Sequence, residues 1–420
     1  MVGGGGREHA LCWSLSQSVA VDRLYAAPGN AGIAELATLV PISAGDVLGT
    51  LEFAERESID LTVVGPEAPL VAGLADEMEA RGLAVLGPTR RAARIEGSKS
   101  WARQLCRRYG IPAPESAEFD DLDTALQYLD GLEPPYVIKA DGLAAGKGVT
   151  VAEDRQAAEG ALRNCLIDRI FGEAGLTVLI EEYLEGWEVS AMALTDGRRV
   201  LPLALAHDYK RALDGDQGPN TGGMGAFSPL PSYGPEGEAR IARTVLEPAV
   251  RALEEEGILY RGVLYAGLMV TAQGPKVLEF NCRFGDPETQ VVLPRLQSNL
   301  GEALLACVEG NLSAYELAWT KQACVGVVLA SAGYPGSHES GKTIEGLAGA
   351  AAVRGVRVFH AGTAERDGRV VTAGGRVLSV TGIGPDLQTA RERAYEGCAL
   401  VRFDGKAYRG DIALDEGPIE

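Results

Sequence analysis

Residues 277–283, Val-Leu-Glu-Phe-Asn-Cys-Arg, carry three side chains suited to metal and phosphate chemistry. On a strand, residues two apart share a face, so Glu279, Asn281 and Arg283 are expected to point the same way. A carboxylate and an amide oxygen suit Mg²⁺, and an arginine can offset charge on a phosphoryl group during transfer. The intervening residues are expected to point into the core: Leu278, Phe280 and Cys282. A half-exposed edge strand explains the alternation equally well, but not the Gly-Asp-Pro-Glu sequence that follows.

The glycine-rich loop 141–148 lies between two predicted strands, 136–139 and 149–153. Its glycines would let backbone N–H groups approach phosphate oxygens, with Lys139 before the loop and Lys147 within it. It is not a Walker A loop, which needs Gly at 141 and Ser or Thr at 148. The loop is therefore predicted to be a flap that closes over phosphates. The alternative is a solvent-facing hairpin with two ordinary lysines.

A predicted strand at 176–181 runs into the acidic segment 181–188. Such a segment resembles a hinge between two lobes, where backbone groups could bind an adenine edge and a carboxylate could bind ribose hydroxyls. A strand end with exposed acids is the alternative, and it is favoured if the segment is judged alone.

A fourth candidate combines Asp208-Tyr-Lys-Arg with Gly-Pro-Asn-Thr-Gly-Gly-Met-Gly at 218–225. Half of the second stretch is glycine, so it cannot supply a core. It suits a loop that wraps a small polar substrate with backbone donors. A plain surface loop remains the competing interpretation.

The composition limits the partners of the chain. Its 420 residues carry a formal net charge of −19, which disfavours nucleic acid and anionic membranes. No apolar run approaches the roughly 18 residues of a membrane span, and the start lacks the apolar core of a signal peptide, so a cytoplasmic location is expected. Seven cysteines occur without a C-x-x-C pair, so neither a zinc site nor a disulfide framework is expected.

Short apolar runs and helical patterns alternate at the start of the chain, which predicts a parallel sheet. Buried strands are expected at 24–27, 61–64 and 83–86, with one amphipathic helix over 70–81 between the last two. The turns 3–7, 28–32 and 65–69 then lie at the carboxyl ends of strands, where such sheets bind ligands. Only Met1 and Val2 precede the first glycine turn. Either the first strand is cut short or the start of the chain is incomplete.

With these segments in order, the chain resembles the ATP-grasp ligases, and among them most closely the phosphoribosylamine–glycine ligase family. The flap and hinge indicate only the ATP-grasp superfamily, whereas 218–226 and 279–290 are specific to this ligase family. The resemblance covers nearly the whole chain. The matching segments are 5–10, 27–32, 64–70, 96–99, 137–149, 218–226, 279–290, 359–363 and 374–378.

The resemblance implies an α/β architecture with an ATP-grasp fold. It places an N-terminal, doubly wound parallel-sheet domain over 1–97, and the central ATP-grasp domain over 98–115 and 188–319. A flap subdomain over 116–187 and a small C-terminal α+β domain over 320–420 complete the expected fold. Further strands are expected at 325–330, 356–360 and 377–381, with helices over 155–168 and 387–398.

The resemblance also implies one reaction, in which ATP, glycine and 5-phosphoribosylamine give glycinamide ribonucleotide, ADP and phosphate in purine synthesis. Glycine would be activated as glycyl phosphate, with Mg²⁺ or Mn²⁺ as cofactor, in an enzyme expected to be a monomer. The implied metal ligands are Glu279 and Asn281, and the implied catalytic residues are Arg283, Lys210 and Asp208. ATP would be bound by Lys99, Lys139, Gly142, Gly146, Lys147, Gly148, Glu182, Leu184 and Glu188. The other substrates would be bound by Gly5, Arg7, Asn30, Glu67, Asn220, Thr221, Gly222 and Gly223.

Three alternatives remain at this stage. Another ATP-grasp carboxylate–amine ligase of purine synthesis would keep the flap and the metal strand but not segments 218–226 and 283–290. A nucleotide-binding regulator without catalysis should have lost Glu279, Asn281 or Arg283, and all three are present. A dinucleotide-dependent dehydrogenase is suggested by the first glycine turn, but Glu8 interrupts the G-x-G-x-x-G pattern and a lone glycine fingerprint is weak.

Overall fold

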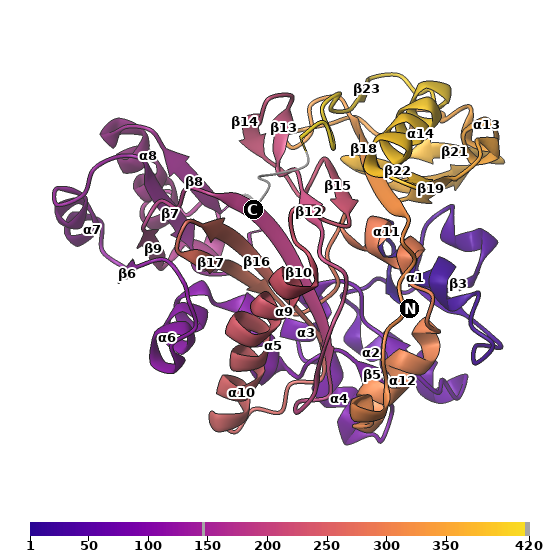
Figure 1. The fold of residues 1–420 in the computed structure, drawn as a ribbon, viewed down its shortest axis with the longest axis horizontal. Coiled ribbons are helices and arrows are strands. Elements are labelled where there is room, and N and C mark those ends of the chain that lie inside the picture. Colours follow the sequence, from indigo (N-terminus) through magenta and orange to yellow (C-terminus); the bar gives the residue numbers. More distant parts are fainter. Residues whose placement is uncertain (145–147, 416–420) are drawn as a thin grey trace.

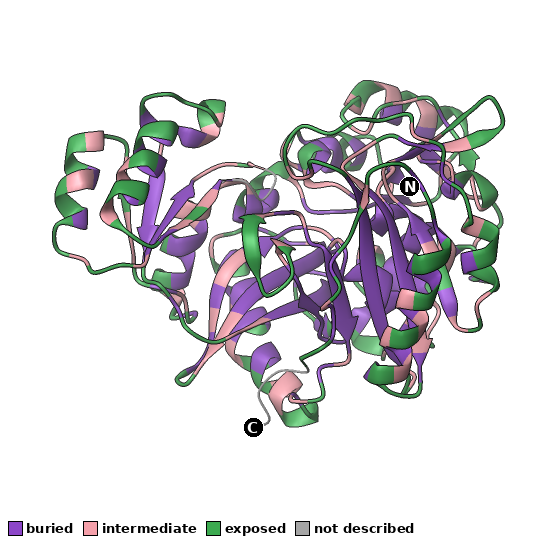
Figure 2. Cartoon of the chain, turned by 90° about the horizontal axis from the view of Figure 1, so that it is seen from above, coloured by how far each residue is buried: buried purple, intermediate pink, exposed green. Residues whose placement is uncertain are grey.

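The structure is a computed structural model that describes residues 1–144 and 148–415. Figure 1 shows a broad body with one α/β subdomain projecting from its side. In Figure 2 the strands of the body are almost wholly buried, whereas the outer faces of the helices are exposed. None of the helices in the described ranges has the length and apolar character needed to cross a membrane.

The N-terminal region is built on parallel strands, as predicted. Two short sheets, ordered β1-β2-β3 and β4-β5, are joined by a parallel bridge between Val2 and Val64. The first strand has only two residues, yet Val2 also pairs with Ala27. The strands are β1 (Val2–Gly3), β2 (Tyr25–Pro28), β3 (Thr38–Leu39), β4 (Thr62–Val63) and β5 (Val85–Leu86). The helices that follow them are α1 (Gly6–Leu15), α2 (Val47–Arg56), α3 (Glu67–Val71), α4 (Leu74–Ala80) and α5 (Arg90–Gly97).

The prediction of one helix over 70–81 is wrong, because the segment forms α3 and α4. Gly73 separates them with a φ of 94°, a left-handed conformation that a helix interior cannot include. Arg90 occupies the space that a Cβ at Gly73 would need, so the break also seats that arginine. Glu67 lies in the first turn of α3, at the start of this broken segment.

The projecting subdomain has an antiparallel sheet ordered β6-β9-β7-β8 and its own hydrophobic core. Helices α7 and α8 cover one face of the sheet (Figure 1). Strands β7 and β8 flank the glycine-rich loop as predicted. The elements are α6 (Lys99–Tyr109), which leads in, then β6 (Ser116–Phe119), α7 (Leu122–Leu129), β7 (Tyr136–Ala140), β8 (Val149–Ala152), α8 (Arg155–Leu166) and β9 (Val178–Glu181).

The central sheet is antiparallel and ordered β11-β10-β16-β17. Helices α9 and α10, joined by a π-helical turn, pack beside it. The strands of the sheet are β10 (Trp187–Thr195), β11 (Val200–Pro202), β16 (Gly262–Thr271) and β17 (Gly274–Asn281), and the helices are α9 (Pro235–Ile241) and α10 (Glu247–Glu255). Two further helices follow β17, namely α11 (Thr289–Val292) and α12 (Leu300–Glu309).

The C-terminal sheet contains two strands from the middle of the chain, β12 and β15, in the order β12-β15-β18-β22-β19. The body is therefore interwoven, because segment 207–228 leaves the central sheet and joins the last one. The elements are β12 (His207–Asp208), β15 (Gly225–Ser228), β18 (Ala323–Ser331), α13 (Leu347–Ala352), β19 (Val356–His360), β22 (Arg376–Gly384), α14 (Leu387–Leu400) and β23 (Lys406–Ala407). Two hairpins form separate two-stranded sheets, β13 (Arg211–Leu213) with β14 (Gln217–Asn220) and β20 (Thr363–Arg366) with β21 (Arg369–Thr372).

Candidate active site

A large cleft of about 1040 Å³ lies where the projecting subdomain, the central sheet and the C-terminal elements meet. It is lined on several sides by side chains from segments far apart in sequence. Most of the predicted site residues line it: Arg7, Glu67, Lys99, Lys139, Gly148, Glu182, Leu184, Glu188, Asp208, Lys210, Asn220, Thr221, Gly222, Glu279, Asn281 and Arg283.

Four predicted residues lie behind the wall of the cleft. Gly5 caps α1 and donates its N–H to Glu8, and Asn30 is used entirely in backbone hydrogen bonds. Gly142 accepts a hydrogen bond from Lys99 at its carbonyl, and Gly223 packs against Pro287 and Asp208. Gly146 and Lys147 lie outside the described residues.

Lys139 is held at the floor of the cleft by a buried ionic cluster. Its ammonium lies 2.7 Å from Glu181, which also receives two hydrogen bonds from Arg103 at 2.6 and 3.1 Å. Burial lowers the pKa of Lys139, and the Glu181 carboxylate opposes that shift. Since Lys139 and Arg103 also donate to the carbonyl of Leu278, the cluster ties strands β7 and β9 to β17.

The carbonyl of Leu278 is available because β17 contains a bulge. Gly267 pairs with Glu279 and Leu268 with Val277, so Leu278 has no partner in the ladder. The extra residue reverses the alternation on one side of the bulge. Val277 therefore points into the core and Leu278 lines the cleft, so the prediction that Leu278 would be buried in the core is wrong. Phe280 and Cys282 are buried as predicted.

Glu279 and Asn281 face the cleft beyond the bulge and present oxygen atoms to a ring of cations. Burial favours the neutral acid, but Lys210, Lys99 and Lys139 together hold the pKa of Glu279 below its ordinary value. The side-chain carboxylate of Glu279 makes no hydrogen bond to the described residues, so both of its oxygens are free to act as ligands.

The oxygen donors available in the cleft fit a magnesium ion that takes some of its ligands from the protein and the others from substrate phosphates. No group of three His, Cys, Asp or Glu side chains in the described ranges is arranged to hold a metal alone. Mg²⁺ commonly uses one or two carboxylates together with substrate phosphates and water. Glu279 and Asn281 match that pattern.

Arg283 stands at the junction between β17 and the N-terminal region. Its guanidinium lies 3.2 Å from Glu67 and 3.3 Å from Glu96, and it donates to Asn281 Oδ1 at 3.2 Å. Burial works against its charge, but Glu96 and Glu67 raise its pKa above the ordinary arginine value. The arginine is therefore charged and fixed beside Glu279 and Asn281 without being neutralised by them.

Asp208 and Lys210 form the opposite wall. Lys210 Nζ lies 2.8 Å from Asp208 Oδ2, whereas Asp208 Oδ1 has no hydrogen-bond partner among the described residues. Burial raises the pKa of Asp208 to about 7, and Lys210 opposes that rise. A Cβ at position 223 would come within 2.6 Å of Asp208 Oδ1, and Gly223 has a φ of 107°. Glycine is thus required where the loop crosses Asp208.

The cleft is more apolar between the projecting subdomain and β16. Val137, Leu184, Leu268 and Met269 line this end beside Glu182 and Glu188. Trp187 stacks on His207 with ring centroids 4.3 Å apart, which closes one side. This pairing of apolar side chains with carboxylates suits a flat aromatic base joined to a hydroxylated sugar.

Several cleft residues were absent from the sequence-based prediction. They are Arg103, Glu181, Glu96, Asp286, Glu288, Arg376, Arg409 and Asp411. Glu288 accepts from Ser190 and Tyr265 at the floor, and Arg376 binds Asp286 and the carbonyl of Gly222. Asp286 and Glu288 could have been found, because they belong to the Gly-Asp-Pro-Glu sequence already noted. Glu181, Glu96 and Arg376 lie in segments 181–188, 96–99 and 374–378, which had been noted without a role for these residues. Arg103, Arg409 and Asp411 lie in segments that carried no such signal.

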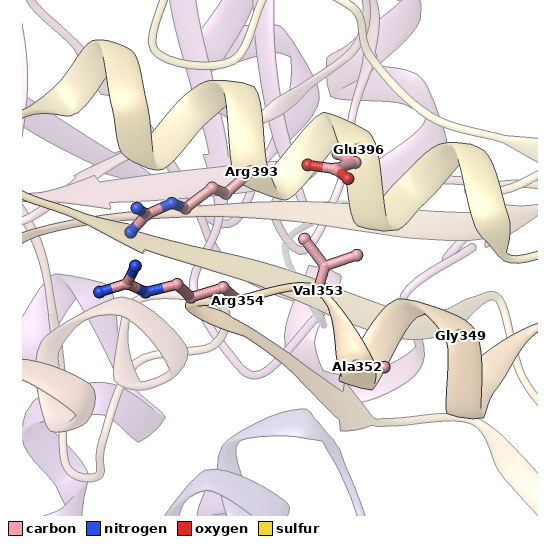
Figure 3. Close-up of a pocket in the computed structure, with 6 residues that line it drawn as sticks. All are labelled: Gly349, Ala352, Val353, Arg354, Arg393 and Glu396. Carbon is pink, nitrogen blue, oxygen red and sulfur yellow. The ribbon is translucent and has the colours of Figure 1, made fainter.

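A second hollow, of about 470 Å³, lies on the surface between α13 and α14 (Figure 3). Arg354 and Arg393 direct their guanidinium groups toward the same end of it. Arg393 is engaged with the carbonyl of Ile383 on β22. None of the predicted site residues lines this hollow, so it is separate from the cleft.

The parallel-stranded N-terminal region, the flap sheet over a central antiparallel sheet and the cationic cleft between them define an ATP-grasp enzyme. Models of the phosphoribosylglycinamide synthetase family match its N domain over residues 1–96, its ATP-grasp domain over 97–289 and its C domain over 324–415. The chain belongs to this family. The predicted fold class and family of ATP-dependent ligases are thereby confirmed.

Individual relatives agree with the family assignment. The chain is 49% identical to phosphoribosylamine–glycine ligase of Pseudomonas aeruginosa over 98% of this chain and 96% of that protein. A phosphoribosylamine–glycine ligase structure from Thermotoga maritima matches with a TM-score of 0.85 and 35% identity, over 98% of each chain. The biotin carboxylase domain of Hydrogenobacter thermophilus 2-oxoglutarate carboxylase, solved with MgADP, shares the fold alone, with a TM-score of 0.74 and 15% identity, over 97% and 90% of the chains.

Proposed function

We propose that the cleft joins glycine to 5-phosphoribosylamine at the expense of ATP, giving glycinamide ribonucleotide, ADP and phosphate. One observation carries the proposal. Glu279, Asn281 and Arg283 leave the end of β17 into a cleft that also contains Lys99, Lys139 and Lys210. Anionic phosphates and a carboxylate are the ligands that such a concentration of cations attracts, in spite of the global charge of −19. The names of the relatives supply the particular amine and acid.

The chemistry requires that glycine be activated before an amine can attack it. A glycine carboxylate oxygen attacks the γ-phosphorus of ATP, the bond to the ADP oxygen breaks, and glycyl phosphate forms. The amine of phosphoribosylamine then attacks the acyl carbon, and phosphate leaves with the carbon–oxygen bonding electrons. A closed site protects the acyl phosphate from water.

The residues of the cleft divide this work by position. Lys99 and Lys139 bind ATP phosphates, while Leu184, Glu182 and Glu188 surround the nucleoside. Glu279 and Asn281 hold Mg²⁺ or Mn²⁺, which when bound neutralises phosphate charge. Arg283 stabilises charge on the phosphoryl group in transit. Asp208, Lys210, Asn220 and Thr221 line the side from which glycine and the amine approach, and Arg7 and Glu67 face them from the N-terminal region.

The proposal is tested by measuring phosphate release from ATP and Mg²⁺ with freshly made phosphoribosylamine, with and without glycine. Release that requires both substrates, with glycinamide ribonucleotide detected, supports the reaction. Glu279→Gln should abolish release, whereas Glu118→Gln, on the exposed edge strand β6, should leave it unchanged. A folded chain that binds ATP but releases phosphate only with a different carboxylate would overturn the glycine assignment.

We further propose that the enzyme acts as a monomer in the cytoplasm, on small molecules alone. The cleft combines side chains from the N-terminal region, the central part and the C-terminal region of one chain, so that catalysis needs no second copy. Sedimentation at assay concentrations should give the mass of one 44.1 kDa chain. A dimer that dissociates with loss of activity would contradict the monomer.

A further inference from the structure

The hairpin formed by β13 and β14 precedes the substrate loop, residues 220–225, and has no hydrophobic core of its own. Its strands are exposed or half-buried, and Leu213 is 58% exposed. An isolated two-stranded hairpin is marginally stable in water. Its last residue is nevertheless Asn220, followed by Thr221, whose N–H and hydroxyl both bind the carbonyl of Lys210. The position of the loop therefore depends on whatever holds the hairpin.

The C-terminal segment 409–413 provides that support. Gly410 N–H donates to Asp214 at 2.7 Å, and Gly215 N–H donates to Asp411 at 2.8 Å, so the segment binds the hairpin turn from both directions. Ala413 N–H donates to the hydroxyl of Tyr209. Figure 1 shows the hairpin between the projecting subdomain and the C-terminal domain.

Arg409 is the centre of this contact and is only 2% exposed. It donates to both oxygens of Asp411 at 2.7 Å, to Asp216 at 2.9 Å and to the carbonyl of Arg211 at 3.1 Å. Its guanidinium also lies 4.9 Å from the ring centroid of Tyr209. One side chain thus joins segment 409–413, the first residue of the hairpin, the hairpin turn and Tyr209, the residue between Asp208 and Lys210.

Segment 409–413 is also anchored to helix α14 of the C-terminal domain. Tyr395 on α14 donates its hydroxyl to the carbonyl of Arg409, and Arg391 donates to the carbonyls of Gly410 and Ile412. These hydrogen bonds connect α14 through segment 409–413 to the hairpin. Three of the residues involved also line the cleft, namely Arg409, Asp411 and Asp216.

We propose that the C-terminal segment 409–413 is a latch that fixes the β13–β14 hairpin, and that Arg409 is a positioning residue for the substrate loop at Asn220 and Thr221. The proposal rests on the function assigned above for its kinetic consequence, but not for its structural one. Arg409 acts through the hairpin, so its loss should affect the binding of glycine and phosphoribosylamine more than that of ATP.

The test compares the complete wild-type chain with Arg409→Met, Arg409→Lys and a control, Arg402→Met, whose side chain is exposed. Amide hydrogen exchange is measured in peptides from the hairpin and the substrate loop, residues 211–223, and in peptides from strands β7 and β8 of the projecting subdomain. Arg409→Met should speed exchange in 211–223 at least 10-fold and leave the β7 and β8 peptides unchanged. Arg409→Lys should restore part of the protection, and Arg402→Met should match the wild type. Unfolding is not expected, since Asp216 is 72% exposed at its side chain and Asp411 has access to water once Arg409 is removed.

The kinetic arm measures KM for each substrate. Arg409→Met should raise KM for glycine or phosphoribosylamine about 10-fold while KM for ATP changes less than 2-fold. Unchanged exchange in 211–223, or exchange raised equally throughout the chain, would overturn the latch. If the wild type lacks the ligase reaction but the hairpin still loosens in Arg409→Met, the proposed function fails and the latch stands.

Discussion

At the scale of single residues, Arg283 determines the charge balance of the cleft. It faces Glu67, Glu96 and Asn281, and it reaches them from three different directions. Glu96 is buried, and burial raises its pKa. The neighbouring guanidinium and the N–H of Cys282 both favour the charged carboxylate there, because a buried charge without a partner is costly. The same guanidinium also donates to Asn281 and to the carbonyl of Phe284, so a transferring phosphoryl group would share it with these partners.

Arg283→Lys should therefore keep the fold but lose activity. An ammonium can pair with one of the two glutamates but cannot hold both in the planar arrangement of a guanidinium. We expect kcat to fall about 100-fold or more, in line with the loss of a transition-state donor, and the melting temperature to fall by a few degrees. The assay is phosphate release, with Arg243→Lys as the control because its ion pair with Glu236 is exposed. Equal kcat values in the two variants would contradict the role of Arg283.

His9 provides a pH-dependent contribution to stability. It is buried, its Nδ1 accepts the N–H of His360 at 2.8 Å, and burial lowers its pKa to about 3. The unfolded chain binds this proton near pH 6.5, so stability is complete above that pH and is lost as pH falls toward the folded pKa. The slope is about 1.4 kcal/mol per pH unit.

The measurement compares urea unfolding of the wild type and His9→Gln at pH 7 and pH 5. The difference in unfolding free energy between the wild type and His9→Gln should fall by about 2 kcal/mol from pH 7 to pH 5, since only the wild type binds a proton at His9 on unfolding. His338→Gln is the control, because His338 is exposed. A wild-type advantage that stays constant with pH would show that His9 is not buried in its neutral form.

At the scale of elements, the alternation of β17 was visible in the sequence and its bulge was not. Glu279, Asn281 and Arg283 could be placed together because a strand repeats every two residues. The bulge at Leu278 depends on the register with β16, which no local pattern reveals. The break between α3 and α4 is similar, because Gly73 is tolerated in a helical pattern unless packing demands a left-handed residue.

Glu181 at the end of β9 has a role that its sequence position alone could not assign. Glu181 is the only carboxylate that directly pairs with both Arg103 and Lys139 among the described ion pairs. Glu181→Gln should lower the pKa of Lys139 further, because the charge that opposes the effect of burial is lost. ATP affinity should fall about 10-fold and should recover as pH is lowered, since protonated Lys139 binds phosphate.

Calorimetric titration with ATP at pH 7 and pH 9 tests this expectation. Glu118→Gln is a matched control, because Glu118 lies on the same sheet but is exposed. Removal of the carboxylate also leaves Arg103 buried without its ionic partner, so a loss of about 3 kcal/mol in unfolding free energy is expected. Weaker binding of the same size at both pH values would mean that Glu181 acts only on the fold.

At the scale of the whole molecule, the regions are joined by contacts that cross large distances in the chain. Segment 207–228 supplies β12 and β15 to the C-terminal sheet, which joins the substrate loop to β18. Composition and periodicity predicted the N-terminal parallel sheet and the C-terminal strands β18, β19 and β22. They could not predict this exchange between sheets, because a short strand such as β15 carries no mark of its partner. The residues that line the cleft from the C-terminal region, Arg376 and Arg409, were missed for the same reason.

Asn30 joins the first region to the last. Its side-chain amide donates to Gly4 at 2.9 Å and to His360 at 2.8 Å, while its oxygen accepts from the N–H groups of Gly32 and Ile33. The residue was predicted from the family resemblance to approach the substrate, but it lies behind the cleft wall and 5% exposed. Its contacts hold the second glycine turn against β19 and the end of the first strand at once.

Asn30→Asp should separate these two sets of contacts. A carboxylate can still accept from Gly32 and Ile33, but it cannot donate, and it brings a charge against two carbonyl oxygens. We expect a loss of about 2–3 kcal/mol in unfolding free energy, the cost of leaving buried polar groups unsatisfied. Asn164→Asp, at an exposed site on α8, should cost nothing measurable. If Asn30 holds the two regions together, amide hydrogen exchange should rise in both β2 and β19, because the side chain of Asn30 contacts His360, 330 residues further along the chain. A rise confined to the turn after β2 would mean that Asn30 stabilises only its own loop.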